Sequence, residues 1–246
     1  MADKVALVTG AARGIGRGCA LALAQEGYDV ALGLRDRAKD EGLVAEIEAL
    51  GQKALPLQLN VLRKTEIDAA VSEALAVFGK IDALVNNAGG GRIANALDVT
   101  EETFDWIVDA NLKGTFFVSQ AVGRAMLAGG GGCIVNIGSQ AGAVALPTES
   151  VYCAAKAAVA HLTKCLAVEW APSVRVNCVA PTFIRTPGTE PALSDPVFER
   201  HVLDMIPLGM IGQVEDVTGA VTFLLSGAAK MITGATLLVD GGWTLR

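Results

Sequence analysis

The sequence predicts an α/β fold in which a doubly wound parallel sheet of about seven strands has helices on both faces. Short apolar runs alternate with longer segments of helical period along the whole chain, which is the order of βαβ units. The runs are mostly continuous rather than alternating in polarity, as expected of strands covered on both faces. The 246 residues, 52% of them hydrophobic, suffice for one large core, so we expect a single domain over residues 1–246.

Each expected element follows from this rhythm. Seven apolar runs predict strands at 4–9, 29–34, 53–59, 82–86, 133–138, 174–180 and 235–240. The segments between them predict helices at 14–26, 38–50, 64–78, 101–128, 149–171 and 214–226. Thr100 and Thr103, at the start of the segment 101–128, have hydroxyl side chains of the kind that favour the start of a helix. The proline-rich segment 182–209 breaks the rhythm after the sixth strand and predicts a loop over a substrate site.

Composition and charge exclude several classes of protein. The net charge of −6 and the lack of a basic run weigh against nucleic acid and anionic membranes as partners. No apolar run is expected to reach membrane-spanning length, and "MADKVALVTG" leads directly into a strand, so we expect a cytoplasmic protein. The histidines, His161 and His201, lack ligand-spaced neighbours, so no metal site is expected. The five cysteines contain no C-x-x-C pair and are expected to be core residues in a reducing compartment: Cys19, Cys133, Cys153, Cys165 and Cys178.

A glycine-rich turn follows the first strand. In "TGAARGIG" (9–16), Gly10, Gly14 and Gly16 have the spacing G-x-x-x-G-x-G between a strand and a helix. Glycines let the backbone approach a pyrophosphate closely, and the helix N-terminus supplies amide donors. The turn therefore predicts a dinucleotide site and a sheet of the Rossmann type.

Further motifs fall in a fixed order along nearly the whole chain. With the glycine turn, this set resembles the short-chain dehydrogenase/reductase family. The resemblance implies an oxidoreductase that interconverts an alcohol and a ketone or aldehyde with a nicotinamide cofactor. The motifs are "NNAG" (86–89), Asn111 in "NLKG", Ser139 in "NIGS", Tyr152 and Lys156, "NCVAPTFIRT" (177–186) and "ITGATLLVDGG" (232–242).

Tyr152 and Lys156 are the expected centre of the chemistry. Their spacing of four residues puts them on one face of a helix. Lys156 and a positively charged nicotinamide are expected to lower the pKa of Tyr152, which could then give and take a proton. Ser139 is expected to hold the substrate oxygen. By resemblance, Asn111 positions a water that links Lys156 to solvent, and Lys156 also binds the nicotinamide ribose.

Two alternatives oppose this interpretation. Tyr152 and Lys156 could be a buried structural pair, and the protein could be a dinucleotide sensor without catalysis. A sensor of this kind normally lacks the serine, the tyrosine or the lysine, whereas this sequence keeps all three. Cys153, beside the tyrosine, has no evident base and is expected to be a packing residue.

The choice of cofactor is argued from charge. Where NAD-preferring members of the family carry an acidic residue, this chain has Leu34, followed by Arg35, and Arg13 lies in the glycine turn. Guanidinium groups suit a 2′-phosphate, so we expect NADP(H) to be preferred over NAD(H), unless Asp36 neutralises Arg35. Asn60 replaces the usual aspartate and could still accept a bond from adenine. The resemblance implies cofactor contacts at Gly10, Arg13, Gly14, Ile15, Gly16, Leu34, Arg35, Asn60, Val61, Asn87, Ala88, Gly89, Tyr152, Lys156, Pro181, Ile184 and Thr186.

Two substrate classes compete: a small polyol or sugar, and the 3-oxoacyl thioester of an acyl carrier protein. Reductases of the second class resemble one another in basic residues at the ends of two central helices, but 127–133 and 169–174 contain none here. Polar residues near the expected pocket favour the polyol or sugar. They are Gln140, Glu149, Arg92, Asn95 and Arg185. Thr182 stands where the family usually has glycine.

The two longest helical segments also predict an assembly. Segments 101–128 and 149–171 carry apolar residues on more than one face. The sheet can cover only the inner face of each, so the outer faces need a partner. By resemblance, these helices form a four-helix contact and the C-terminal strand forms a second one. We therefore expect a homotetramer.

Overall fold

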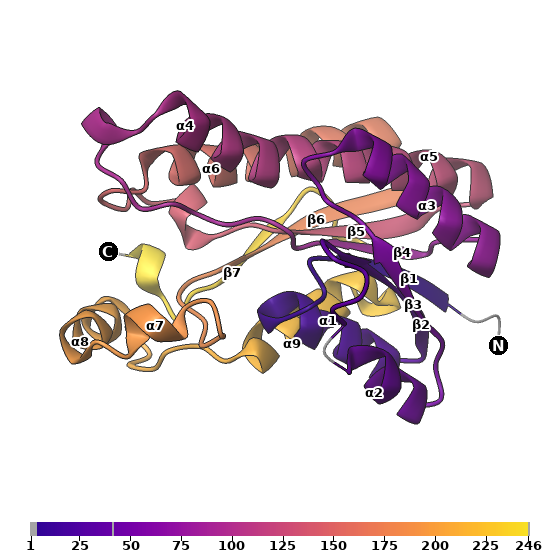
Figure 1. Ribbon diagram of the computed structural model, residues 1–246, viewed down its shortest axis with the longest axis horizontal. Coiled ribbons are helices and arrows are strands. Elements are labelled where there is room, and N and C mark those ends of the chain that lie inside the picture. The colour runs from indigo at the N-terminus through magenta and orange to yellow at the C-terminus, as the bar shows by residue number, and fades with distance from the viewer. Residues whose placement is uncertain (1–3, 41, 246) are drawn as a thin grey trace.

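The computed structural model describes residues 4–40 and 42–245 and contains one parallel sheet of seven strands (Figure 1). The strand order is β3-β2-β1-β4-β5-β6-β7, which reverses direction between β1 and β4 and is therefore doubly wound. This confirms the predicted fold class. The strands are β1 (Lys4–Thr9), β2 (Tyr28–Leu34), β3 (Ala54–Gln58), β4 (Ala83–Asn86), β5 (Gly132–Ile137), β6 (Val174–Pro181) and β7 (Thr236–Val239).

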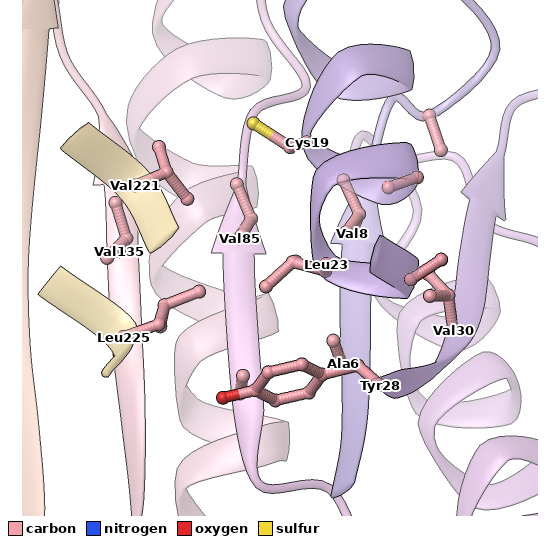
Figure 2. Packing of buried hydrophobic residues seen from close by; sticks show 14 of the residues in the cluster. Ala6, Val8, Cys19, Leu23, Tyr28, Val30, Val85, Val135, Val221 and Leu225 are labelled. Carbon is pink, nitrogen blue, oxygen red and sulfur yellow. The ribbon is translucent and has the colours of Figure 1, made fainter. Parts of the chain in front are cut away.

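Helices cover both faces of the sheet because successive strand residues point to opposite sides. In β1, Ala6 and Val8 pack with α1 (Gly14–Gln25), α2 (Leu43–Ala49) and α9 (Val214–Leu225), as Figure 2 shows in part. Leu7, between them, packs on the other face. The helices there are α3 (Lys64–Phe78), α5 (Gly114–Gly129) and α6 (Ser150–Trp170).

Two predicted helices differ from the structure. The segment 38–50 becomes helical only at Leu43, because Gly42 has a left-handed backbone with φ of 79°. The segment 101–128 is divided into α4 (Glu101–Val108), a π-helical segment (Asp109–Lys113) and α5. Thr100 caps α4 as predicted, accepting a hydrogen bond from the Thr103 N–H at 3.2 Å.

The segment 182–209 is not the expected loop. It contains α7 (Glu190–Leu193) and α8 (Pro196–Met205), and each helix has a proline in its first turn, where no N–H donor is required. Leu193, Val202 and Trp243 belong to a separate small core that joins this segment to the C-terminal tail. In Figure 1, α7 and α8 lie near the C terminus at one end of the sheet.

Two expectations from composition also need correction. By length and composition α6 could cross a membrane, contrary to the expectation that no apolar run is long enough. It packs against the sheet through Leu166 and Ala167. Cys165, expected in the core, is exposed on this helix.

Within the described residues, no group of three or more metal-ligating side chains occurs.

Candidate active site

The glycine turn has no room for side chains. A Cβ on Gly16 would collide with the Gly10 carbonyl and with the Asn87 amide. Gly10 and Gly14 have positive φ values of 66° and 56°, which disfavour other residues. The first turn of α1 has no side-chain cap, so its N–H groups remain available to a ligand. This cradle fits the pyrophosphate of a dinucleotide.

Thr9 and Asn87 join the turn to the end of β4. The Thr9 hydroxyl oxygen accepts hydrogen bonds from the N–H groups of Asn87 and Ala88, both at 3.0 Å. The Asn87 amide in turn donates to the carbonyls of Thr9 and Gly10. Sequence reasoning named Asn87, Ala88 and Gly89 but missed Thr9, whose signal is its position directly before Gly10 at a strand end.

Arg13 in the glycine turn and Arg35 after β2, both expected to lie at the adenosine end of the cofactor, are exposed. Asp36, which could have neutralised Arg35, lies 3.4 Å from the Lys39 ammonium instead. Across residues 4–40 and 42–245, neither Arg13 nor Arg35 forms an ion pair. Leu34 is 1% exposed, so its side chain belongs to the core and leaves this position without a polar group.

Asn60 and Val61 follow β3 in the same region. The Asn60 side-chain oxygen accepts a hydrogen bond from the Leu62 N–H at 3.1 Å, and a second lone pair remains for a ligand. Val61 packs so closely on Gly114 that a Cβ there would lie 2.8 Å from the valine Cβ. This contact holds the end of β3 against the start of α5.

Ser139, Tyr152 and Lys156 meet at the carboxyl end of β5. The Lys156 ammonium lies 5.6 Å from the centre of the Tyr152 ring and donates to the Ile137 carbonyl at 2.9 Å. Ser139 follows β5 and shares a hydrogen bond with the Tyr152 hydroxyl. The Ser139 hydroxyl also donates to the Gln140 side-chain oxygen at 3.1 Å. Strand β5 thus positions Ser139 at its end and holds the Lys156 ammonium through the Ile137 carbonyl.

Lys156 is not among the protein groups that shift the pKa of Tyr152, and the predicted joint effect of Lys156 and a positively charged nicotinamide stays a prediction. Burial raises the pKa of Tyr152 to about 12, and the hydrogen bond with Ser139 only partly opposes this. Burial also lowers the pKa of Lys156 to about 8. Spacing placed the two groups on one face, but the ammonium is directed at the Ile137 carbonyl. At neutral pH the phenol is therefore a proton donor.

Asn111 lies in the π-helical segment and is fully buried. Its side-chain oxygen accepts from the Gly90 N–H at 3.1 Å, while its amide donates to the carbonyls of Gly90 and Ile107 at 2.7 and 2.8 Å. A Cβ on Gly89 would collide with the Asn111 side-chain oxygen and would lie 3.8 Å from the Lys156 ammonium. The side chain therefore fixes the loop beside the lysine, and π-helical segments are frequent at functional sites.

The segment after β6 folds over the glycine turn. Pro181 ends β6, and Ile184 is 3% exposed and pairs with Gly212. The Thr189 hydroxyl donates to the Ile184 carbonyl, and the Thr186 side chain lies beside Gly14. The hydroxyl of Thr182, which replaces the usual glycine, is buried with no hydrogen-bond partner among the described residues.

The expected substrate residues separate into two groups. Gln140 is buried next to Ser139, and the half-buried Glu149 lies close enough to Tyr152 to raise its pKa. Burial raises the pKa of Glu149 itself. These two residues share the reaction centre.

Arg92 and Arg185 are each held by other side chains, and their contact with substrate stays a prediction. The Arg92 guanidinium stacks 4.5 Å from the centre of the Trp106 ring. Arg185 is held by Glu190 and Glu199, at 3.1 and 2.6 Å, within the segment that sequence reasoning expected to be a loop. Asn95 is exposed, directly before a short 3₁₀ helix (Ala96–Asp98).

Comparison with known proteins identifies the family. Residues 10–244 match a family model described as enoyl-(acyl carrier protein) reductase. The chain is 42% identical to an NAD-dependent glycerol dehydrogenase of Listeria innocua, over 99% of this chain and 95% of that protein. It is 44% identical to a 3-oxoacyl-acyl-carrier-protein reductase of Staphylococcus aureus, over 97% of each chain.

A solved structure agrees with these matches. The crystal structure of a gluconate 5-dehydrogenase from Burkholderia cenocepacia, in complex with NADP and tartrate, superposes with a TM-score of 0.95 at 36% identity. The match covers 100% of this chain and 97% of that one. The chain therefore belongs to the short-chain dehydrogenase/reductase family and is an oxidoreductase acting on CH–OH groups.

Proposed function

We propose that the protein is an NADP(H)-dependent oxidoreductase that interconverts a secondary alcohol and a carbonyl group, in a small polyol or sugar. Tyr152 gives a proton to the carbonyl oxygen or takes one from the alcohol, because it is the acid at the reaction centre. Ser139 holds the substrate oxygen beside it, and Lys156 binds the nicotinamide ribose. The bound nicotinamide supplies or accepts the hydride.

Preference for NADP(H) is supported by Arg13 and Arg35. Both guanidinium groups are exposed at the adenosine end, and neither forms an ion pair with a described residue. A 2′-phosphate takes charge-assisted hydrogen bonds from such groups, whereas a ribose hydroxyl would favour a carboxylate. The related glycerol dehydrogenase is NAD-dependent, so the preference is a property to be measured for this chain.

Arg13→Gln together with Arg35→Gln is expected to weaken NADP binding by roughly 100-fold or more and to change NAD binding little. Each charge-assisted hydrogen bond contributes about 1.5–3 kcal/mol. Fluorescence titration with both cofactors measures this. Arg37→Gln is the matched control, since Arg37 already pairs with Glu73 at 2.7 Å. Equal losses for NADP and NAD would contradict the assignment.

A polyol or sugar substrate is supported chiefly by Glu149. This half-buried side chain provides an acceptor close to the Tyr152 phenol, with the Gln140 amide near Ser139. Groups of this kind discriminate strongly for hydroxylated molecules, because a substrate without hydroxyls leaves them unpaired. The relatives include enzymes named for glycerol and gluconate.

Glu149→Leu is expected to lower kcat/KM for a polyol by roughly tenfold or more. A simple secondary alcohol has no second hydroxyl, so its kcat/KM should change much less. The ratio of kcat/KM for the polyol to kcat/KM for the simple alcohol separates recognition of the second hydroxyl from any effect of the substitution on Tyr152. Glu149→Gln, which keeps an acceptor oxygen, should retain most of the preference. A uniform loss for both substrates would place Glu149 outside substrate recognition.

Reduction of a 3-oxoacyl thioester is the second candidate, favoured by the 44% identity to the Staphylococcus aureus reductase. Against it, the segments 127–133 and 169–174 carry no basic residue to attract an acidic carrier protein. A dinucleotide sensor without catalysis is excluded for a chain that is an oxidoreductase. The thioester therefore remains as the competing substrate.

We also propose a cytoplasmic homotetramer. Large apolar side chains remain exposed on α6 and β7, namely Val168 at 80%, Leu237 at 38% and Leu238 at 39%. Such surface is stabilised when a second copy covers it. Light scattering of the purified protein should give four times the chain mass of 25.3 kDa, and a monomeric mass would contradict the proposal.

A further inference from the structure

A pocket lies at the amino ends of the strands, at the opposite end of the sheet from the glycine turn. Its volume is about 260 Å³, below the usual range of roughly 300–1,000 Å³ for ligand sites, so it suits a small molecule. Its lining comes from the amino ends of five strands and from the segment after α9. The lining residues used below are Lys4, Tyr28, Asp82, Arg175, Ser226 and Lys230.

The lining is predominantly cationic. Lys4, Arg175 and Lys230 contribute three positive charges. The acidic residue, Asp82, is neutralised, because its carboxylate lies 3.0 Å from the Lys80 ammonium and accepts the Val5 N–H at 2.8 Å. The pocket therefore keeps an excess of positive charge in a chain whose net charge is −6.

Arg175 is held in place before any ligand binds. Its guanidinium donates to the carbonyls of Ile232 and Ser226 at 3.1 and 3.2 Å. A guanidinium has five N–H donors, so three remain for a ligand. Lys4 is also oriented, with its ammonium 5.3 Å from the centre of the Tyr28 ring. Such fixed donors lose little entropy on binding.

Tyr28 supplies a donor that the fold leaves unused. The residue is 6% exposed, and its ring extends from β2 across Ala6 with the hydroxyl toward the side of Leu225 (Figure 2). Within the described part of the chain, this hydroxyl has no hydrogen-bond partner. Burial raises the pKa of Tyr28, so the phenol stays protonated at neutral pH. The hydroxyl itself is not shielded from solvent, so it can donate a hydrogen bond to a ligand acceptor in the pocket.

We propose that this pocket at the amino edge of the sheet binds a small oxyanion, either free phosphate or the phosphate group of a small phosphomonoester. Three cations and a neutral phenol match an anion with several acceptor oxygens and more than one negative charge. The site shares no residue with the cofactor and substrate sites, so it is independent of the proposed function.

Calorimetric titration of inorganic phosphate into the cofactor-saturated protein tests the proposal. Saturation with cofactor keeps phosphate out of the dinucleotide site, and chloride holds the ionic strength constant. Saturable binding is expected. Tyr28→Phe should weaken it roughly tenfold, since it removes one hydrogen bond to a charged ligand and keeps the ring. Lys230→Gln should weaken it several-fold, and Lys164→Gln, an exposed lysine on α6, is the control.

Glycerol 3-phosphate in a parallel titration distinguishes the two sources of phosphate. Tighter binding than inorganic phosphate would assign the site to a phosphomonoester, and equal or weaker binding would assign it to free phosphate. The melting temperature of each variant checks that it is folded. Absence of saturable binding, or native binding in both Tyr28→Phe and Lys230→Gln, would overturn the proposal.

Discussion

Tyr152→Phe is expected to lower turnover by roughly 10²- to 10⁴-fold in both directions of the reaction, the usual contribution of a positioned general acid or base. The variant keeps the ring and removes only the hydroxyl that shares a hydrogen bond with Ser139. Cofactor binding should change far less than turnover, because only one of the expected cofactor contacts is altered and the glycine turn is untouched. Steady-state kinetics and a cofactor titration measure the two effects separately.

The pH dependence of the native enzyme provides a second readout. Since burial raises the pKa of Tyr152 to about 12, the phenol is protonated through the neutral range. Carbonyl reduction should therefore change little with pH there, while alcohol oxidation should rise as the pH rises. Cys153→Ala is the matched control and should retain native turnover. Turnover of Tyr152→Phe within tenfold of native would transfer the acid role to another group.

Lys156→Met is expected to stabilise the fold and to abolish most activity. A pKa lowered from 10.5 to about 8 means that the charged lysine costs about 3 kcal/mol in the folded protein. Leaving the Ile137 carbonyl without its donor offsets about 1 kcal/mol of that gain. The net increase in the free energy of unfolding at pH 7 should be about 2 kcal/mol, while turnover falls by roughly 100-fold or more.

The pH window of this stabilisation follows from the direction of the shift. Below about pH 8 the lysine is charged in both folded and unfolded chains, so its cost is fully present. Between pH 8 and 10.5 the folded protein binds fewer protons, and the cost disappears as the pH rises. The advantage of methionine should shrink over the same window in urea unfolding. Lys164→Met, on the exposed side of α6, is the control, and a destabilised Lys156→Met would contradict the account.

The strands and the glycine turn were predictable because their signals are local. Continuous apolar runs define β1 and β6 almost to the residue, and the spacing of Gly10, Gly14 and Gly16 identifies the turn. The shortened α2 also has a local cause, the positive φ of Gly42. That conformation depends on the surrounding turn, which composition does not specify.

The features that the sequence did not predict depend on contacts between segments that are distant along the chain. The π-helical segment interrupts a stretch that the sequence predicts as one helix, and it places Asn111 where Gly90 can bind it. The spacing of Tyr152 and Lys156 fixes a shared face, but the Ile137 carbonyl on β5 decides where the ammonium points. Arg185 looked available because its partners, Glu190 and Glu199, lie on helices that prolines seemed to exclude.

The most direct measurement of the central claim is turnover of small polyols and sugars, followed by the absorbance of the reduced nicotinamide, with NADP and NAD in turn. Reduction of an acetoacetyl thioester is run alongside. The account predicts turnover of a polyol or sugar, with kcat/KM at least roughly tenfold higher for NADP than for NAD, the value of one charge-assisted hydrogen bond. Activity on the thioester alone, or a preference for NAD, would contradict it.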